Sequence, residues 1–268
     1  MSHPLPSVAL TIAGSDSGGG AGIQADLKTF HAFNVFGTSV VTALTAQNTM
    51  GVRSVHPVPL EMVRDQIDAV VEDLAPTAVK TGMLATTALV ETVARAIRDH
   101  GLTSYVLDPV MVASSGDRLL DEDAVETVRT RLLPLARIVT PNLEEARILT
   151  GLEIQDEEGQ RRAAHRLVEM GARAALVKGG HGTGAELTDL LWDGSREEIW
   201  HRPRVDTRHT HGTGCTLSAG ITAGLSQGTE LTRAVDRALA FVAGAIATAP
   251  GLGAGHGPIN HHYVAPGR

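Results

Sequence analysis

The 268-residue sequence predicts an α/β fold, with a mostly parallel central sheet covered by helices on both faces. Two observations predict it. Short β-rich apolar runs alternate with longer runs whose apolar residues recur every three or four positions. Polar motifs directly follow several of the short runs, and ligands of such sheets bind outside the carboxyl ends of the strands. Because no linker, repeat or low-complexity segment divides the chain, we expect one domain over residues 1–268.

The first half of the chain begins with an apolar strand that runs into a glycine cluster and then a helix. The helix ending near residue 101 has Gly101 after its last turn, where glycine adopts the left-handed conformation that ends helices. In order, we expect a strand at Val8–Ala13, a helix from about Gly22 to Phe33, a strand at Ser39–Ala46, a helix over Leu60–Leu74, a strand at Ala78–Lys80, a helix from Leu89 to Gly101, and a strand at Tyr105–Leu107.

The second half continues the alternation and adds one antiparallel pair that turns at Asp193-Gly194. We expect a helix over Ala124–Leu132 that stops near Pro134, a strand at Arg137–Val139, a helix ending before Gly171, a strand at Ala174–Val177, paired strands at Leu187–Trp192 and Glu197–Trp200, and helices at about Gly214–Ser226 and Leu231–Thr248.

Composition narrows the class of protein. The 23 basic and 30 acidic residues give a net charge of −7, which argues against nucleic-acid binding. The longest apolar stretch, Ala238–Ala249, is well short of the ~20 residues that cross a bilayer. The start of the chain lacks the features of a signal peptide. A single cysteine fits a reducing compartment, so we expect a soluble cytoplasmic protein with no membrane partner.

The glycine cluster Gly18–Gly22 does not match the common nucleotide-binding motifs. A dinucleotide fingerprint wants an acidic residue ~20 positions later, but none lies between Asp26 and Glu61. A Walker A loop needs a Gly-Lys pair, and none of the three lysines follows a glycine. The cluster is either a flexible strand-to-helix turn or a backbone that closely approaches a small ligand.

The segment Thr210–Thr216 leads into an Ala/Gly-rich helix. Gly212, Thr213 and Gly214 allow successive N–H groups to point inward at a helix N-terminus, which predicts an anion hole. Cys215 lies in the first helical turn, where we expect the helix dipole to lower the thiol pKa. An isolated cysteine is more often a buried small apolar residue, but this glycine-rich context favours a functional thiol.

Two further motifs admit two interpretations each, and a group of histidines admits one. Asn142 and Glu145, three residues apart, either hold Mg²⁺ together with Asp108 or form an N-terminal capping box. Lys178, which precedes Gly179-Gly180, either neutralises phosphate oxygens or is an ordinary surface lysine. The five histidines from His209 to His262 lack the spacing of a zinc site.

Taken in order, these motifs resemble the ribokinase-like superfamily, and within it the hydroxymethylpyrimidine/phosphomethylpyrimidine kinases of thiamine synthesis. The resemblance spans residues 7 to 263. It is carried by Ala9–Gly19, Gly22–Phe30, Ala46–Thr49, Lys80–Leu84, Leu107–Met111, Thr140–Ala146, Lys178–His181 and Thr210–Thr216.

The resemblance implies a role for each motif in an ATP- and Mg²⁺-dependent kinase. Cys215 resembles the general base, in an anion hole of Gly212, Thr213 and Gly214, and Lys178 resembles a lysine that contacts ATP phosphates. Asn142 and Glu145 resemble a magnesium site, with Asp108 nearby. Gln47 resembles the glutamine that binds the aminopyrimidine. The implied remainder of that pocket is Asp26, Gly14, Ala21, Met83 and Val110.

The implied reaction phosphorylates 4-amino-5-hydroxymethyl-2-methylpyrimidine to its monophosphate and then to its diphosphate. Related pyridoxal kinases tend to carry methionine at the position of Gln47 and to lack the lysine, so Gln47 and Lys178 favour the pyrimidine. The alternatives are a pyridoxal or pyridoxine kinase and a non-catalytic pyrimidine- or nucleotide-binding regulator. A homodimer is implied only as the habit of the family.

Overall fold

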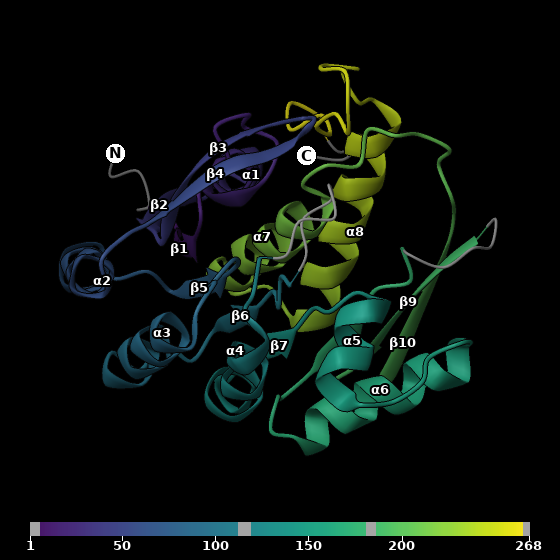
Figure 1. Ribbon diagram of the computed structural model, residues 1–268. Coiled ribbons are helices and arrows are strands. Elements are labelled where there is room, and N and C mark those ends of the chain that lie inside the picture. The colour runs from purple at the N-terminus through teal and green to yellow at the C-terminus, as the bar shows by residue number, and fades with distance from the viewer. Residues whose placement is uncertain (1–5, 112–118, 181–185, 265–268) are drawn as a thin grey trace, which may run out of the picture.

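The computed structural model describes residues 6–111, 119–180 and 186–264. Within them, an eight-stranded sheet has the order β10-β9-β8-β7-β6-β5-β1-β2 (Figure 1). Neighbouring strands from β8 to β2 are parallel, and β9 and β10 add an antiparallel edge. The strands are β1 (Val8–Ala13), β2 (Phe36–Val41), β5 (Ala78–Thr81), β6 (Tyr105–Leu107), β7 (Ile138–Val139), β8 (Ala175–Val177), β9 (Glu186–Trp192) and β10 (Glu197–Pro203).

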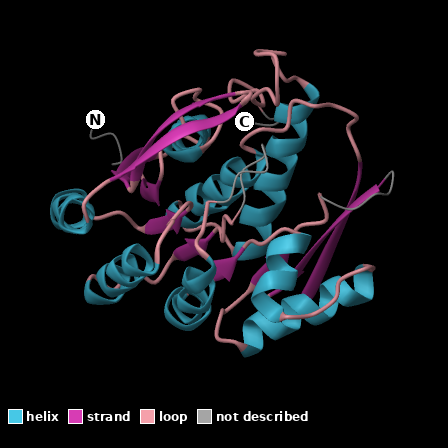
Figure 2. Cartoon of the chain, viewed as in Figure 1, coloured by secondary structure: helices cyan, strands magenta, loops and turns pink. Residues whose placement is uncertain are grey.

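Helices cover both faces of this sheet, as Figure 2 shows. One face is covered by α1 (Gly22–Ala32), α7 (Thr213–Ser226) and α8 (Leu231–Ala247). The other is covered by α2 (Leu60–Leu74), α3 (Thr87–Asp99), α4 (Glu122–Thr127), α5 (Leu143–Thr150) and α6 (Glu157–Glu169). The expected α/β class, with a mostly parallel sheet between two helical layers, is therefore confirmed. Within the described residues, no helix is both long and apolar enough to span a bilayer.

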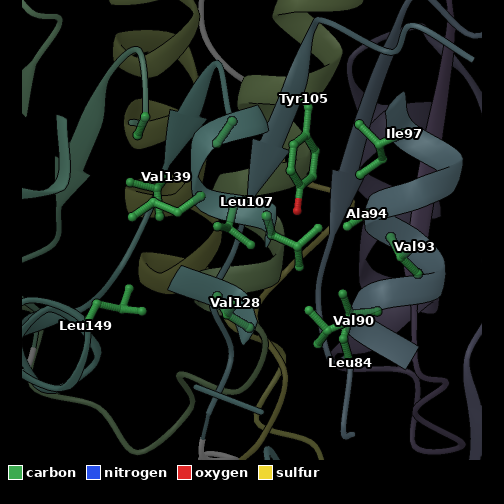
Figure 3. Close-up of a cluster of buried hydrophobic side chains, with 14 of the residues drawn as sticks. Leu84, Val90, Val93, Ala94, Ile97, Tyr105, Leu107, Val128, Val139 and Leu149 are labelled. Atoms are coloured by element: carbon green, nitrogen blue, oxygen red, sulfur yellow. The ribbon is translucent and has the colours of Figure 1, made fainter. Parts of the chain in front are cut away.

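Strand β6 illustrates how the two cores form. Its three residues are all buried, and successive side chains of a strand point to opposite faces. Tyr105 and Leu107 therefore pack into the core beneath α3, where Figure 3 shows them opposite Val93, whereas Val106 packs beneath α7 and α8. A sheet buried on both faces needs such continuous apolar strands, which is why the sequence lacks polar alternation there.

The strand expected at Ser39–Ala46 is wrong, because the chain divides at Thr42. Residues Ala43–Asn48 form β3, which leaves the sheet and pairs with β4 (Gly51–Pro57) in a separate antiparallel hairpin (Figure 1). The Thr42 N–H donates to the Ala13 carbonyl at 2.9 Å, and its hydroxyl donates to Met83 at 3.0 Å. These tertiary contacts, rather than any break in hydrophobic pattern, end the strand.

The helix expected at Ala124–Leu132 is correct in place but irregular in form. After α4 the chain continues as a π-helical turn at Val128–Leu132 and a 3₁₀ turn at Leu133–Leu135, which contains Pro134. The other predicted elements are confirmed to within a few residues, and Gly101 has the left-handed φ of +62° expected after a helix.

Candidate active site

The predicted polar motifs meet at one edge of the sheet. Gly14 follows β1, Gly82 follows β5, Asp108 follows β6, Asn142 follows β7 and Lys178 follows β8. These five strands are parallel neighbours, so their carboxyl ends open on the same side. The motifs therefore lie at one edge of the sheet, where the sequence predicts a ligand site.

The N-terminus of α7 faces this edge. Gly212 precedes the helix with a φ of +85°, and a side chain there would collide with the carbonyl oxygen of Gly20. A Cβ on Gly214 would lie 3.6 Å from Lys178 Nζ and 3.9 Å from Asp108 Oδ2. At Gly214 the backbone therefore has no side chain on the side that faces the Lys178 ammonium, which suits a bound anion.

Lys178 is held in a buried cluster of charges. Its Nζ lies 3.4 Å from Asp108 Oδ1, and Asp108 Oδ2 accepts a hydrogen bond of 3.1 Å from Ser218 on α7. Burial alone would lower the pKa of Lys178, but Asp108 and Glu145 raise it, so the ammonium stays charged. It is therefore not an ordinary surface lysine. His181, the last residue of the predicted motif, lies outside the described residues.

Asn142 and Glu145 form the capping box of α5. The Glu145 N–H donates to Asn142 Oδ1 at 2.9 Å, and the Asn142 N–H donates to Glu145 Oε2 at 2.8 Å. Burial raises the pKa of Glu145 to about 7; Lys178 opposes this rise and Asp108 adds to it. Asp108 and Glu145 are thus two buried acids near one lysine, a donor set that would accept a further cation. No group of three or more His, Cys, Asp or Glu side chains suited to a metal occurs among the described residues.

The expectation that the pKa of Cys215 is lowered is wrong. Burial raises the pKa of the thiol to about 12, because desolvation outweighs the opposing effects of Lys80 and of the Gly22 N–H. A helix terminus contributes typically ~0.3–1 kcal/mol, too little to offset the loss of water around a thiolate. The Gly22 hydrogen bond nevertheless places Cys215 where α1 and α7 both begin.

Beneath the cysteine lies a fully buried ion pair that sequence reasoning missed. Lys80 Nζ lies 3.0 and 3.1 Å from the two carboxylate oxygens of Asp26, and Thr11 donates to Asp26 Oδ2 at 2.6 Å. Asp26, predicted to line the substrate pocket, has its carboxylate engaged in this pair. Lys80 appeared only as part of a family motif, although a lysine within the apolar strand Ala78–Thr81 was itself a signal, since buried lysines are rare unless paired.

The residues predicted to line the substrate pocket come from several loops. A Cβ on Gly14 would lie 3.4 Å from Met83 Cε, so these two residues are in contact range. The Ala21 N–H donates to Asp16 at 2.8 Å at the start of α1. Val110 follows β6 and borders a small cleft with Gly82 and Asp108.

Gln47 lies on β3, at an irregularity of the hairpin between Ala46 and Gln47. Ser17 fixes its backbone, because the Ser17 hydroxyl accepts from the Gln47 N–H and donates to its carbonyl, both at 2.8 Å. The side chain of Gln47 is half-buried.

Comparison with known proteins agrees with this arrangement. The family model for phosphomethylpyrimidine kinase matches residues 16–260. The chain is 51% identical to a hydroxymethylpyrimidine/phosphomethylpyrimidine kinase of Streptomyces coelicolor, over 98% of this chain and 99% of the relative. It is 50% identical to the Bacillus subtilis enzyme of that name, over 94% of each chain.

Among solved structures, an ADP complex of Bacillus subtilis pyridoxal kinase has a TM-score of 0.89 and 37% identity, covering 96% of this chain and 98% of that one. Its similarity extends across the whole sheet and both helical layers, so the fold is ribokinase-like. Identity near 50% over almost the full length, together with the gathering of the motif residues at one sheet edge, places this chain in the phosphomethylpyrimidine kinase family.

Proposed function

We propose that this site transfers the γ-phosphoryl group of ATP to 4-amino-5-hydroxymethyl-2-methylpyrimidine and then to the resulting monophosphate, as a step of thiamine synthesis. The observation that carries the proposal is the position of Lys178 and Asp108 directly opposite the bare backbone of Gly214. Phosphoryl transfer needs positioning and charge stabilisation more than covalent chemistry, and this arrangement supplies both. The names of the relatives support the substrate.

In this proposal the backbone N–H groups of Gly212, Thr213 and Gly214 bind the transferring phosphoryl group. Lys178 neutralises oxygens of the ATP phosphates from the opposite side. Cys215 accepts the proton of the hydroxymethyl group as that oxygen attacks phosphorus in line. The raised pKa of Cys215 means that only a small fraction of the free protein holds the thiolate this step requires.

Asp108 and Glu145 would hold Mg²⁺, and Asn142 keeps Glu145 in place through the capping box. The fit rests on the two buried carboxylates, whose charge Lys178 alone does not balance. When bound, the ion neutralises charge on the nucleotide phosphates. The ADP complex of the similar pyridoxal kinase supports an adenine nucleotide as the phosphoryl donor.

Gln47 is proposed to recognise the aminopyrimidine through hydrogen bonds to the edge of its ring. A side-chain amide donates to a ring nitrogen and accepts from an exocyclic amine, which a thioether cannot do. Gly14, Ala21, Met83 and Val110 would border the ring. The carboxylate of Asp26 is paired with Lys80, and this ion pair would fix the floor of the pocket from beneath.

The second phosphorylation needs no base, because a phosphate oxygen of the monophosphate is already anionic. This second transfer uses the same anion hole and the same Lys178. Cys215 therefore matters for the first transfer and much less for the second.

A coupled assay of ATP consumption tests the function. Purified protein with Mg²⁺ receives the hydroxymethylpyrimidine, its monophosphate, or pyridoxal, first separately and then in competition at limiting ATP. We expect turnover of both pyrimidines and a clear preference over pyridoxal. Preferential use of pyridoxal would favour the second candidate, which the similarity to pyridoxal kinase supports. Tight pyrimidine binding without ATP consumption would indicate a regulator.

We also propose that the chain acts as a single kinase domain over residues 1–268 and works in the cytoplasm, where ATP is abundant and Cys215 stays reduced. A second copy is proposed to cover exposed apolar side chains of β2 and of the β3–β4 hairpin, including Phe36, Leu44 and Met50. Light scattering would test the homodimer. Leu44→Glu should shift the measured mass from that of a dimer toward that of a monomer. A wild-type protein that is already monomeric would contradict the proposed homodimer.

A further inference from the structure

We propose that Asp16 and His211 are a pair of positioning residues. Their contact fixes the glycine loop on the substrate side, residues 14–22, against the anion hole formed by residues 212–214. Neither residue has a role of its own in the proposed phosphoryl transfer. The inference rests on the proposed kinase function. The pair holds the two loops that surround Cys215 at a fixed distance from each other.

Asp16 organises the glycine loop through its side chain. Its Oδ1 accepts from the Gly18 N–H at 2.8 Å, and its Oδ2 accepts from Gly20 at 3.0 Å and from Ala21 at 2.8 Å. The side chain of Gln24 accepts from the Asp16 N–H at 2.8 Å. A carboxylate that accepts several backbone N–H groups fixes a loop that its glycines would otherwise leave flexible.

His211 contributes the fourth contact to the same carboxylate, from 195 residues further along the chain. Its Nε2 lies 2.9 Å from Asp16 Oδ2, and both side chains are buried. The backbone N–H of His211 donates to the Gly257 carbonyl at 3.1 Å, so a C-terminal segment also fixes the backbone of His211. A Cβ on Gly20 would lie 2.6 Å from His211 Cδ2, which shows how closely the imidazole packs on the loop.

The position of His211 links this contact to catalysis. It directly precedes Gly212, whose left-handed backbone packs against the Gly20 carbonyl oxygen. On the other side of the loop, the Gly22 N–H donates to Cys215. The Asp16–His211 contact therefore fixes two features at once. It positions the anion hole that receives the phosphoryl group, and it positions the Gly22 N–H that contacts the proposed base, Cys215.

The same contacts argue against Asp16 as a base in its own right. Burial opposes ionisation, but the hydrogen bonds from His211 and from the Ala21 and Gly18 N–H groups prevail and lower the pKa of Asp16. The carboxylate is in contact with four polar groups of the protein, three of them on Oδ2 and one on Oδ1. Its role is geometric, exerted through the loops.

The experiment compares His211→Ala, Asp16→Asn and the double variant with the wild type, measuring kcat and KM for both phosphoryl transfers and the melting temperature. A misplacement of about 1 Å in an active site costs on the order of 10²-fold in rate. We expect kcat to fall roughly 10- to 100-fold for both transfers alike, with little change in KM. The double variant should be no worse than the poorer single variant, because the residues act as one unit.

Two further variants keep the result interpretable. His211→Gln retains an N–H donor and should restore a large part of kcat. His262→Ala removes an exposed histidine from the C-terminal segment that braces His211, and should leave both transfers unchanged.

A drop in melting temperature without a drop in kcat at a temperature where the protein is folded would overturn the inference. So would strictly additive losses, no rescue by glutamine, or loss of only one of the two transfers. Absence of kinase activity in the wild type would instead count against the proposed function, which separates the two failures.

Discussion

The two sides of the candidate site are built differently. On the phosphate side, Asp108 directly follows β6 and Glu145 lies in the first turn of α5, and both are buried. The largely buried Lys178 follows β8 and lies 3.4 Å from Asp108. On the substrate side, Gln47 lies half exposed on the β3–β4 hairpin, which pairs with no strand of the main sheet.

This difference separates chemistry from recognition. Buried charges at the ends of strands are preorganised, since moving one would leave another unpaired in a low-dielectric interior. A hairpin outside the sheet tolerates changes of side chain with small effects on stability. We therefore expect substitutions on the phosphate side to affect turnover or folding strongly, and those on the hairpin to affect substrate choice.

Cys215→Ala is expected to have the largest effect. Removing a general base costs about 10²- to 10⁴-fold, so the first transfer should fall by that factor, while the second should fall less than about tenfold because no proton has to be removed. The two rates are measured separately by product analysis. Equal losses in both transfers would show that Cys215 is not the base.

The pH dependence of the first transfer comes next in size. Because the pKa of Cys215 is raised to about 12, the thiolate fraction increases with pH throughout the neutral range. The kcat/KM should therefore rise about tenfold per pH unit between roughly pH 6.5 and 8.5. Cys215→Ala serves as the control and should flatten this slope. A plateau near pH 7 in the wild type would show that the thiolate is already formed.

Lys80→Met tests the buried ion pair beneath Cys215. Breaking a buried ion pair leaves an uncompensated charge and costs about 3–5 kcal/mol of unfolding free energy. Chemical denaturation measures this loss. The double variant Lys80→Met/Asp26→Leu removes both charges and should recover much of the stability. If it is no more stable than the single variant, packing rather than charge explains the loss.

Acid should weaken the protein through His261, which lies under the first turn of α7 and bonds to Thr216 at 2.9 Å. Burial lowers the pKa of His261 to about 4. Between that value and the unfolded pKa near 6.5, the unfolded chain binds more protons, so stability falls as pH decreases.

The full effect of His261 is roughly 3 kcal/mol of unfolding free energy, expected between pH ~6.5 and ~4. Denaturation curves across that range measure it. His261→Gln keeps a polar partner for Thr216 without titrating, and should reduce the slope. An unchanged slope in this variant would assign the acid sensitivity to other groups.

The sequence predicts the order of strands and helices well, because periodicity reports which faces are buried. It fails at Thr42, where the pattern is continuous but tertiary hydrogen bonds turn the chain out of the sheet. It also misjudges Cys215, because a motif shows the helix terminus nearby but not the depth of burial that decides the pKa. The Asp16–His211 contact joins residues 195 positions apart, beyond the reach of local pattern.

Gln47→Met is the smallest expected effect and the sharpest test of the contrast between the two sides. Losing the proposed amide contacts should reduce kcat/KM for the hydroxymethylpyrimidine by about 10- to 100-fold, while pyridoxal is affected less. Stability should stay within ~0.5 kcal/mol of the wild type, because the half-exposed side chain packs into no core cluster. Competition assays at limiting ATP measure the ratio, with Ala46→Ser on the same strand as a matched control. If Gln47→Met instead lowers turnover of both substrates equally, the hairpin contributes to chemistry, and the division between the two sides is wrong.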